Sequence, residues 1–149
     1  LVLYQMVDKH GQILYDMIKN TEKLGERKVF FVHGGVDADD REEIRRIMEV
    51  ENDAIVVASF GTYSTGINIR NLHNIIFASP SKSRVRNLQS IGRGLRKMDG
   101  KEIATLYDIA DDLRVGKHIN STLQHFIERV KIYNEEKFPF KTYNIGLKA

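Results

Sequence analysis

The chain contains no cysteine, and no stretch of its 149 residues stays apolar for long. The lack of cysteine excludes disulfide bonds and thiolate metal sites, and it fits a cytoplasmic protein. A membrane helix needs about 18 consecutive apolar residues, and a secretory signal needs a charged segment followed by an apolar one. The sequence offers neither, so it predicts no membrane span and no signal peptide.

The composition is that of one globular domain. Hydrophobic residues make up 42% of the chain, which is enough for one well-packed core at this length. The formal net charge of +3 is a mild indication of a polyanionic partner. The chain does not begin with methionine but opens on Leu1, Val2 and Leu3, a pattern typical of a buried strand. We therefore expect residues 1–149 to be a single domain and a fragment of a longer protein.

Apolar strands alternate with amphipathic helical patterns along the chain. Short apolar runs predict strands at 1–5, 29–32, 54–58, 74–78 and 103–109, and segments of helical periodicity lie between them. Near-continuous apolar strands that alternate with helices indicate a parallel sheet with both faces covered. The expected fold class is α/β, a doubly wound parallel sheet with helices on both faces.

The last part of the chain predicts a long helix at about 117–137, followed by a strand near 143–147. The apolar stripe of this helix either covers one face of the sheet or docks on another domain of a longer protein. The stripe comprises Ile119, Leu123, Phe126, Ile127, Val130 and Tyr133.

The most informative segment is the octet at residues 89–96, QSIGRGLR in one-letter code. At about 100° per residue in a helix, Gln89, Arg93 and Arg96 fall on one face, and an apolar stripe forms a separate face. The two glycines of the octet weaken a helix, so they indicate close backbone approach or space beside a ligand. The pattern predicts an anion-binding helix, and a solvated basic surface is the alternative.

Three polar or glycine-rich groups follow predicted strands. Residues 33–35 (His-Gly-Gly) follow the second strand, residues 64–66 (Ser-Thr-Gly) follow the third, and the arginine helix at 83–97 follows the fourth. The ligand crevice of an open α/β sheet lies at the carboxyl ends of its strands, so we expect the three groups to converge on one edge. Purely structural explanations also exist: Gly34 and Gly35 as an ordinary turn, Ser64 and Thr65 as caps of a short helix, and His33 as a hydrogen-bonded loop residue.

Together these segments resemble the motifs of superfamily 2 helicases. The octet at 89–96 matches QxxGRxxR, the sixth motif of that family. Residues 29–35 with Arg41 resemble the fourth motif, and residues 58–68 resemble the fifth, in the same order and at similar spacing. The resemblance covers most of the chain and is strong toward phage-encoded members over residues 33–112. It implies a RecA-like fold and the second, C-terminal motor domain of such a helicase.

The resemblance also implies roles for residues that contact the nucleotide. Arg96 is expected to act as the arginine finger on the γ-phosphate, with Arg93 beside it. Arginine suits this task because its planar guanidinium stays protonated and binds phosphate oxygens in pairs. Gln89 is expected to sense the nucleotide state, and Gly66 and Asn68 to lie near the ribose. Many members carry an acidic residue at the position of Asn68 and histidine at that of Gln89.

A second set of residues is expected to contact the nucleic-acid backbone. The resemblance implies that His33, Gly34 and Arg41 line the phosphate track, together with Ser64 and Thr65. A translocase needs such backbone contacts because it moves along nucleic acid without reading bases. Further positive charge lies near the start of the arginine helix, at Lys82, Arg84 and Arg86, and a solvated basic face explains these three residues equally well.

The motifs that complete an ATPase are absent from the sequence. There is no GxxxxGK[ST] phosphate loop, and no strand is followed by a DExD or DExH quartet. The resemblance therefore implies that ATP and Mg²⁺ act only together with an N-terminal RecA-like domain, and that the isolated chain is inactive. Asp108, Asp111 and Asp112 are explained by a strand end and a helix cap, and we expect no metal site.

The resemblance implies an ATP-dependent DNA helicase or translocase. Among its members it points to branched DNA or RNA–DNA hybrids as substrates, to recombination and repair, and to the host cytoplasm if the chain is phage-encoded. One alternative is a non-catalytic nucleic-acid-binding module with the same fold, against which the arginine pair argues. Another is a stand-alone phosphotransferase, against which the missing phosphate loop argues.

Overall fold

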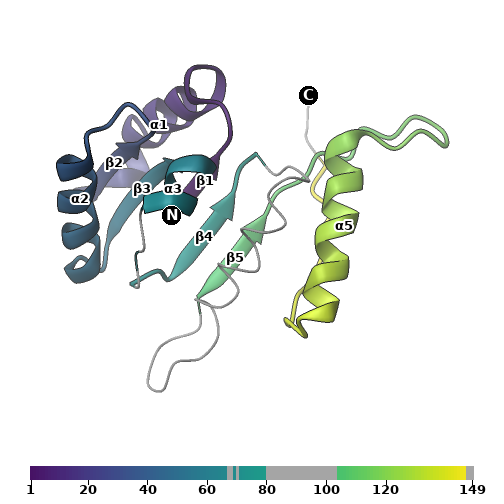
Figure 1. Ribbon diagram of the computed structural model, residues 1–149. Coiled ribbons are helices and arrows are strands. Elements are labelled where there is room, and N and C mark those ends of the chain that lie inside the picture. Colours follow the sequence, from purple (N-terminus) through teal and green to yellow (C-terminus); the bar gives the residue numbers. More distant parts are fainter. Residues whose placement is uncertain (67–68, 70, 80–103, 147–149) are drawn as a thin grey trace.

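Within the residues that the structure describes, five parallel strands form one sheet (Figure 1). The computed structural model describes residues 1–66, 69, 71–79 and 104–146. Neighbouring strands follow the order β2-β3-β1-β4-β5, and all four pairings are parallel. The strands span Val2–Tyr4 (β1), Lys28–Val32 (β2), Ala54–Ser59 (β3), Asn74–Phe77 (β4) and Thr105–Asp108 (β5).

Helices alternate with the strands, as the sequence pattern predicts. A π-helical turn at Val7–Gly11 leads into α1 (Gln12–Lys19), and a short 3-10 turn at Glu22–Leu24 precedes β2. The remaining described helices are α2 (Ala38–Val50), α3 (Phe60–Gly66) and α5 (Ser121–Glu135). None of the helices in the described ranges combines the length and apolar content that a membrane crossing requires.

The predicted α/β class is confirmed, and each of the five predicted strands is found within a few residues of its expected bounds. Helices pack on both faces of the sheet because strands that are apolar on both sides must be covered twice. Helices α2, α3 and α5 contribute Met48, Phe60 and Tyr133 to the core on one face. Helix α1 contributes Leu14 and Ile18 to the core on the other face.

Gly11 is required where the chain turns from β1 into α1. A Cβ atom at this position would lie 2.4 Å from two ring atoms of Tyr4. The Tyr4 ring cannot move aside easily, because it is fully buried, stacks on Phe31 and reaches the carbonyl oxygen of Val32 through its hydroxyl. Only glycine at position 11 lets the segment that leads into α1 pass so close to Tyr4 of β1.

Helix α5 is shorter than predicted, and its buried face differs from the predicted apolar stripe. Tyr133 is buried as expected, but Ile119 and Ile127 are 48% and 41% exposed. Arg129 is instead the most deeply buried side chain of the helix, at 1% exposure. The apolar pattern alone missed this face because a charged side chain lies at its centre.

A buried ion pair joins α5 to β5. Arg129 donates to both carboxylate oxygens of Asp108 at 2.7 and 2.8 Å, and the Tyr133 hydroxyl donates to the same carboxylate at 2.6 Å. Burial, together with the Asp108 charge, raises the pKa of Tyr133 far above its usual value. The hydroxyl therefore stays protonated and remains a donor. Asp108 thus fixes which face of α5 turns toward the sheet.

The predicted strand near 143–147 is not found in the described part of that range. Residues 138–146 form no regular structure, and Tyr143 and Ile145 are 75% and 83% exposed. Helix α5 ends where Lys137 adopts a left-handed backbone, with φ of 57°, and the Phe138 N–H reaches back to the Tyr133 carbonyl. This C-terminal cap turns the chain away, and residues 143–146 pair with no strand.

A Gly11→Ala substitution tests the close approach to Tyr4. The added methyl group must displace a buried ring, and overpacking of this kind costs about 1–3 kcal/mol of unfolding free energy. Gly61→Ala, inside α3, is the matched control, because apart from its chain neighbours and the backbone of its own helix no heavy atom lies within 4 Å of the position that its Cβ would take. Chemical denaturation should show a lower midpoint for Gly11→Ala alone. Equal midpoints for both variants would contradict the packing constraint.

An Arg129→Met substitution tests the buried ion pair. It leaves the Asp108 carboxylate buried without its cation, which should cost about 3–5 kcal/mol in unfolding free energy. Arg114→Met is the control, because Arg114 also binds its partner, Asp112, through two nitrogens but at the surface. That variant should leave the unfolding midpoint almost unchanged. A stable Arg129→Met protein would show that apolar packing alone holds α5.

Candidate functional site

The carboxyl ends of all five strands lie at one edge of the sheet, because every pairing is parallel. The turn at residues 33–36 follows β2, and α3 follows β3, which is the immediate neighbour of β2. The structure therefore brings the turn that contains His33 and the start of α3 to adjacent positions on this edge, whereas the backbone of Ser64 and Thr65 lies in the last turn of that helix. Open α/β sheets bind their ligands at this edge.

His33 organises the turn after β2. Its Nδ1 atom accepts a hydrogen bond from the Gly35 N–H at 3.1 Å, and its carbonyl oxygen accepts one from the Val36 N–H at 3.1 Å. The predicted alternative, a hydrogen-bonded loop histidine, is thus present in the structure. Because Nδ1 is engaged, an outside ligand can reach this ring only through Nε2. Around Gly34, no heavy atom lies within 4 Å of an added Cβ, so the backbone there is accessible.

Aromatic rings behind His33 hold it in place, and sequence reasoning did not identify them. The His33 ring lies 5.1 Å from the ring of Phe31, which itself stacks on Tyr15 at 5.1 Å and on Tyr4 at 5.7 Å. These residues come from β2, α1 and β1. The sequence contained one signal for this support. Residues two positions apart along a strand point to the same face, and Phe31 and His33 are two positions apart.

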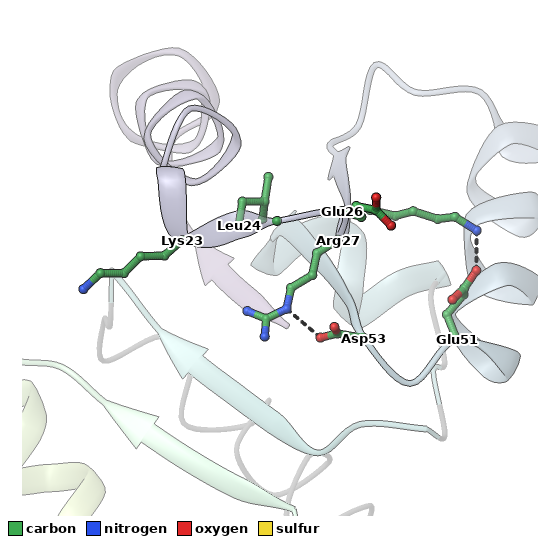
Figure 2. A pocket seen from close by; sticks show the side chains of 8 residues that line it. Lys23, Leu24, Glu26, Arg27, Glu51 and Asp53 are labelled. Atoms are coloured by element: carbon green, nitrogen blue, oxygen red, sulfur yellow. Dashed lines mark hydrogen bonds and ion pairs between the residues drawn. The ribbon is translucent and has the colours of Figure 1, made fainter.

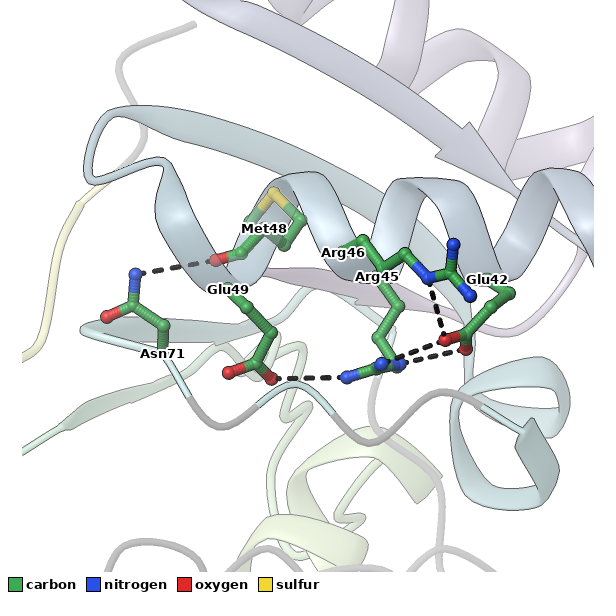
Figure 3. Close-up of polar contacts among 6 residues, drawn as sticks. All are labelled: Glu42, Arg45, Arg46, Met48, Glu49 and Asn71. Atoms are coloured by element: carbon green, nitrogen blue, oxygen red, sulfur yellow. Dashed lines mark hydrogen bonds and ion pairs between the residues drawn. The ribbon is translucent and has the colours of Figure 1, made fainter.

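Arg41 stands in the first turn of α2, among acidic residues, and its Nε atom is buried with no acceptor in the described part of the chain. The two arginines that follow it on this helix are neutralised (Figure 3). Arg45 binds Glu42 through two nitrogens at 2.8 Å, and Arg46 binds the same carboxylate at 3.4 Å. The hydrogen bond from Arg45 lowers the pKa of Glu42 to about 2, so the pairs persist at neutral pH.

Ser59, not Ser64 or Thr65, caps the helix after β3. The Ser59 hydroxyl accepts a hydrogen bond from the Thr62 N–H at 3.2 Å and lies 2.8 Å from the Thr62 hydroxyl, and both side chains are buried. The backbone of Ser64 and Thr65 belongs to the last turn of α3. The predicted alternative of these two residues as caps is therefore wrong. A serine at the end of an apolar strand was the signal for the true cap.

The strand order adds a segment that sequence reasoning left out of the site. β1 lies between β3 and β4, so residues 5–11, which follow β1, stand at the middle of the carboxyl edge. Sequential strands usually lie side by side, and that rule would have placed β1 next to β2. Here β3 is inserted between them, which no local pattern in the sequence reveals.

Several predicted site residues lie outside the described residues. These are the nucleotide-contacting and basic residues of the arginine helix and the fifth-motif asparagine, namely Asn68, Lys82, Arg84, Arg86, Gln89, Arg93 and Arg96. The structure places β4, the strand that precedes the arginine helix in sequence, beside β1. Of Gly66, the structure describes the backbone as the final residue of α3.

The acidic residues near the end of β5 are engaged with protein groups. Asp108 ends β5, as predicted, and is bound by Arg129 and Tyr133. Asp112 pairs with Arg114 at the surface. The helix-cap part of the prediction is wrong, because Asn120 occupies the N-cap position of α5. These contacts stabilise the loop after β5 and do not gather the carboxylates around one point.

A hollow at the opposite edge of the sheet is unrelated to these groups (Figure 2). It lies at the amino-terminal ends of β2 and β3, and its charges form pairs across the two strands. Arg27 binds Asp53 at 2.7 Å, and Lys28 binds Glu51. Because the cations are matched by carboxylates, the hollow has no excess charge that would attract a phosphate.

Comparisons with known proteins agree with this geometry. The C-terminal part of the Fun30 ATPase domain has a similar fold, with a TM-score of 0.55 and 17% identity, covering 90% of this chain and 47% of that one. The ATP-dependent DNA helicase UvsW of Enterobacteria phage T4 is 38% identical over 148 residues, covering 91% of this chain and 29% of its own length. The chain thus spans less than a third of that relative. The family model for the helicase conserved C-terminal domain matches residues 1–98, and the chain therefore belongs to this family.

Proposed function

We propose that this chain is the C-terminal motor domain of a longer ATP-dependent superfamily 2 DNA helicase or translocase. One observation carries the proposal. The turn at His33 and the helix that bears Ser64 and Thr65 follow adjacent parallel strands, at the ligand-binding edge of a domain of the helicase family. The exposed turn after β2 can offer backbone amides to a phosphate backbone, and Ser64 and Thr65 are proposed to offer their hydroxyls.

The nucleic-acid track in this proposal consists of His33, Gly34, Arg41, Ser64 and Thr65. His33 is held by its Nδ1 bond and by the Phe31 ring, so its position does not have to be ordered when a ligand binds. Arg41 is the arginine of α2 proposed for phosphate, since Arg45 and Arg46 are bound to Glu42. The nucleic acid fitting this set is read through its backbone and not through its bases.

The nucleotide side of the proposal rests on Arg93 and Arg96 as phosphate-binding arginines, with Gln89, Gly66 and Asn68 near the nucleotide. Hydrolysis would take place between this domain and an N-terminal RecA-like domain of the same protein. Asp108 and Asp112 are bound to Arg129 and Arg114, so these two carboxylates do not suit a Mg²⁺ ion. The magnesium ligands and the phosphate loop would therefore come from the N-terminal domain, and the chain itself would supply positive charge to the transferring phosphate.

The substrate class proposed for the complete protein is branched DNA or an RNA–DNA hybrid, in recombination and repair. The similarity to UvsW, a DNA helicase by name, supports this extension. A protein of this kind, encoded by a phage, would act in the host cytoplasm. A non-catalytic nucleic-acid-binding module is the alternative, and it would bind DNA without hydrolysing ATP.

Arg96→Ala in the complete protein tests the nucleotide side. ATP binding should largely persist while kcat falls by about 10³-fold or more, because an arginine finger acts mainly in the transition state. Arg27→Ala is the control, because Arg27 lies at the opposite edge and pairs with Asp53. Steady-state ATPase assays measure both. A higher KM with unchanged kcat would reduce Arg96 to a ground-state contact, and turnover by the isolated chain would contradict the two-domain site.

Arg41→Ala and Thr65→Ala in the complete protein test the nucleic-acid track. Both should weaken DNA binding to a similar degree for all sequences, and Arg41→Ala should reduce the salt slope of binding by about one unit. Arg46→Ala is the control, because Arg46 lies about 140° around α2 from Arg41 and is bound to Glu42. Fluorescence anisotropy at several salt concentrations measures the slopes. Losses limited to particular sequences would argue against a backbone track.

A further inference from the structure

Asn71 joins two elements that the proposed function assigns to different ligands. It lies in the connection between α3 and β4, and its side-chain amide points at the C-terminal end of α2 (Figure 3). The Nδ2 atom donates to the carbonyl oxygens of Met48 at 3.4 Å and Glu51 at 3.2 Å. It also reaches the Asn52 side-chain oxygen at 3.5 Å.

These contacts replace a local cap that α2 lacks. The last carbonyls of any helix have no partner within the helix, and glycine or a basic residue commonly compensates. The last turn of α2 contains no basic residue, and Glu51, the C-cap residue after Val50, has an extended backbone with φ of −82° and ψ of 129°. The Asn71 amide therefore caps α2 from another part of the chain.

Apolar packing on both sides of Asn71 reinforces the link. Ile69 is buried at 4% exposure, and Leu72 packs against the same core cluster. Met48 of α2, whose carbonyl accepts the Asn71 amide, belongs to that cluster as well. Ile69, Asn71 and Leu72 cannot shift along α2 without disturbing both the amide bonds and this core.

We propose that Asn71 is a positioning residue that couples nucleic-acid binding to the nucleotide site. This inference rests on the proposed function. Arg41 stands in the first turn of α2, two helical turns before Met48, whereas Gly66 and Asn68 shortly precede Asn71 in the chain. Because α2 is a continuous helix, a displacement at its phosphate-binding end is carried to its capped end. Asn71 passes that displacement to the segment that carries the nucleotide contacts, and the coupling acts equally in both directions.

Asn71→Ala in the complete protein tests the coupling by separating basal from DNA-stimulated ATP hydrolysis. Hydrolysis without DNA should stay within about twofold of the unmodified protein, while stimulation by a forked DNA oligonucleotide should fall about tenfold, within the usual range of coupling between two sites. In the unmodified protein, binding of a slowly hydrolysed ATP analogue should change the affinity for that DNA. In Asn71→Ala, the factor of this change should be about tenfold smaller. Asn71→Asp should give the same losses, because it preserves the size of the side chain and removes the donor.

Asn134→Ala is the matched control, because the Asn134 amide also donates to a helix carbonyl, that of Val130, but within its own helix. It should leave basal and stimulated rates unchanged. Full stimulation in both Asn71 variants would overturn the inference and leave the proposed function intact. Parallel loss of both rates with a lowered melting temperature would overturn it too, by reducing Asn71 to a structural cap. An unmodified protein without DNA-stimulated hydrolysis would instead refute the proposed function.

Discussion

Parallel pairing of the five strands is the constraint on which the other features of the domain depend. Because all strands run the same way, each connection must return across a face of the sheet, and all carboxyl ends meet at one edge. Both faces must then be covered, which places α1 on one side and α2, α3 and α5 on the other. The turn at His33 and the start of α3 come to adjacent strand ends only through this pairing, although His33 and Phe60 are 27 positions apart in the sequence.

The elements of the fold were largely predictable, because short apolar runs and helical periodicity are local properties of the sequence. The order of the strands was not predictable in this way, and β1 lies at the centre although it comes first in the chain. The buried face of α5 was predicted only in part, since Tyr133 and Val130 of the expected stripe pack in the core but Arg129 was not expected there. Its centre is Arg129, and a buried arginine becomes favourable only when Asp108, about twenty residues away, supplies the matching carboxylate. The spacing of apolar residues cannot predict such a buried ion pair.

In the candidate site too, some features were predictable from local sequence and others depend on tertiary contacts. His33 and α3 directly follow the adjacent strands β2 and β3, as the sequence predicted, whereas ligand binding at this edge stays a prediction. The cap at Ser59 was missed because Ser64 and Thr65 are closer to the expected turn, whereas α3 begins directly at the end of β3. The support of His33 by Phe31 was missed because a single strand does not show which rings from α1 and β1 pack against it. Local chemistry identified candidate residues, and tertiary contacts determine how they are held.

In the proposed nucleic-acid track, the charges at the start of α2 make the placement of the contacts more important than the net charge of the chain. Asp37, Asp39 and Asp40 precede Arg41, where they favour the positive end of the helix dipole. The same carboxylates repel a phosphate backbone at distances up to about 10 Å at ordinary salt concentrations. Arg41 can therefore bind a phosphate strongly only if the backbone is brought to it at short range by other contacts. A groove completed by a second domain meets that condition, whereas the modest net charge of this chain does not.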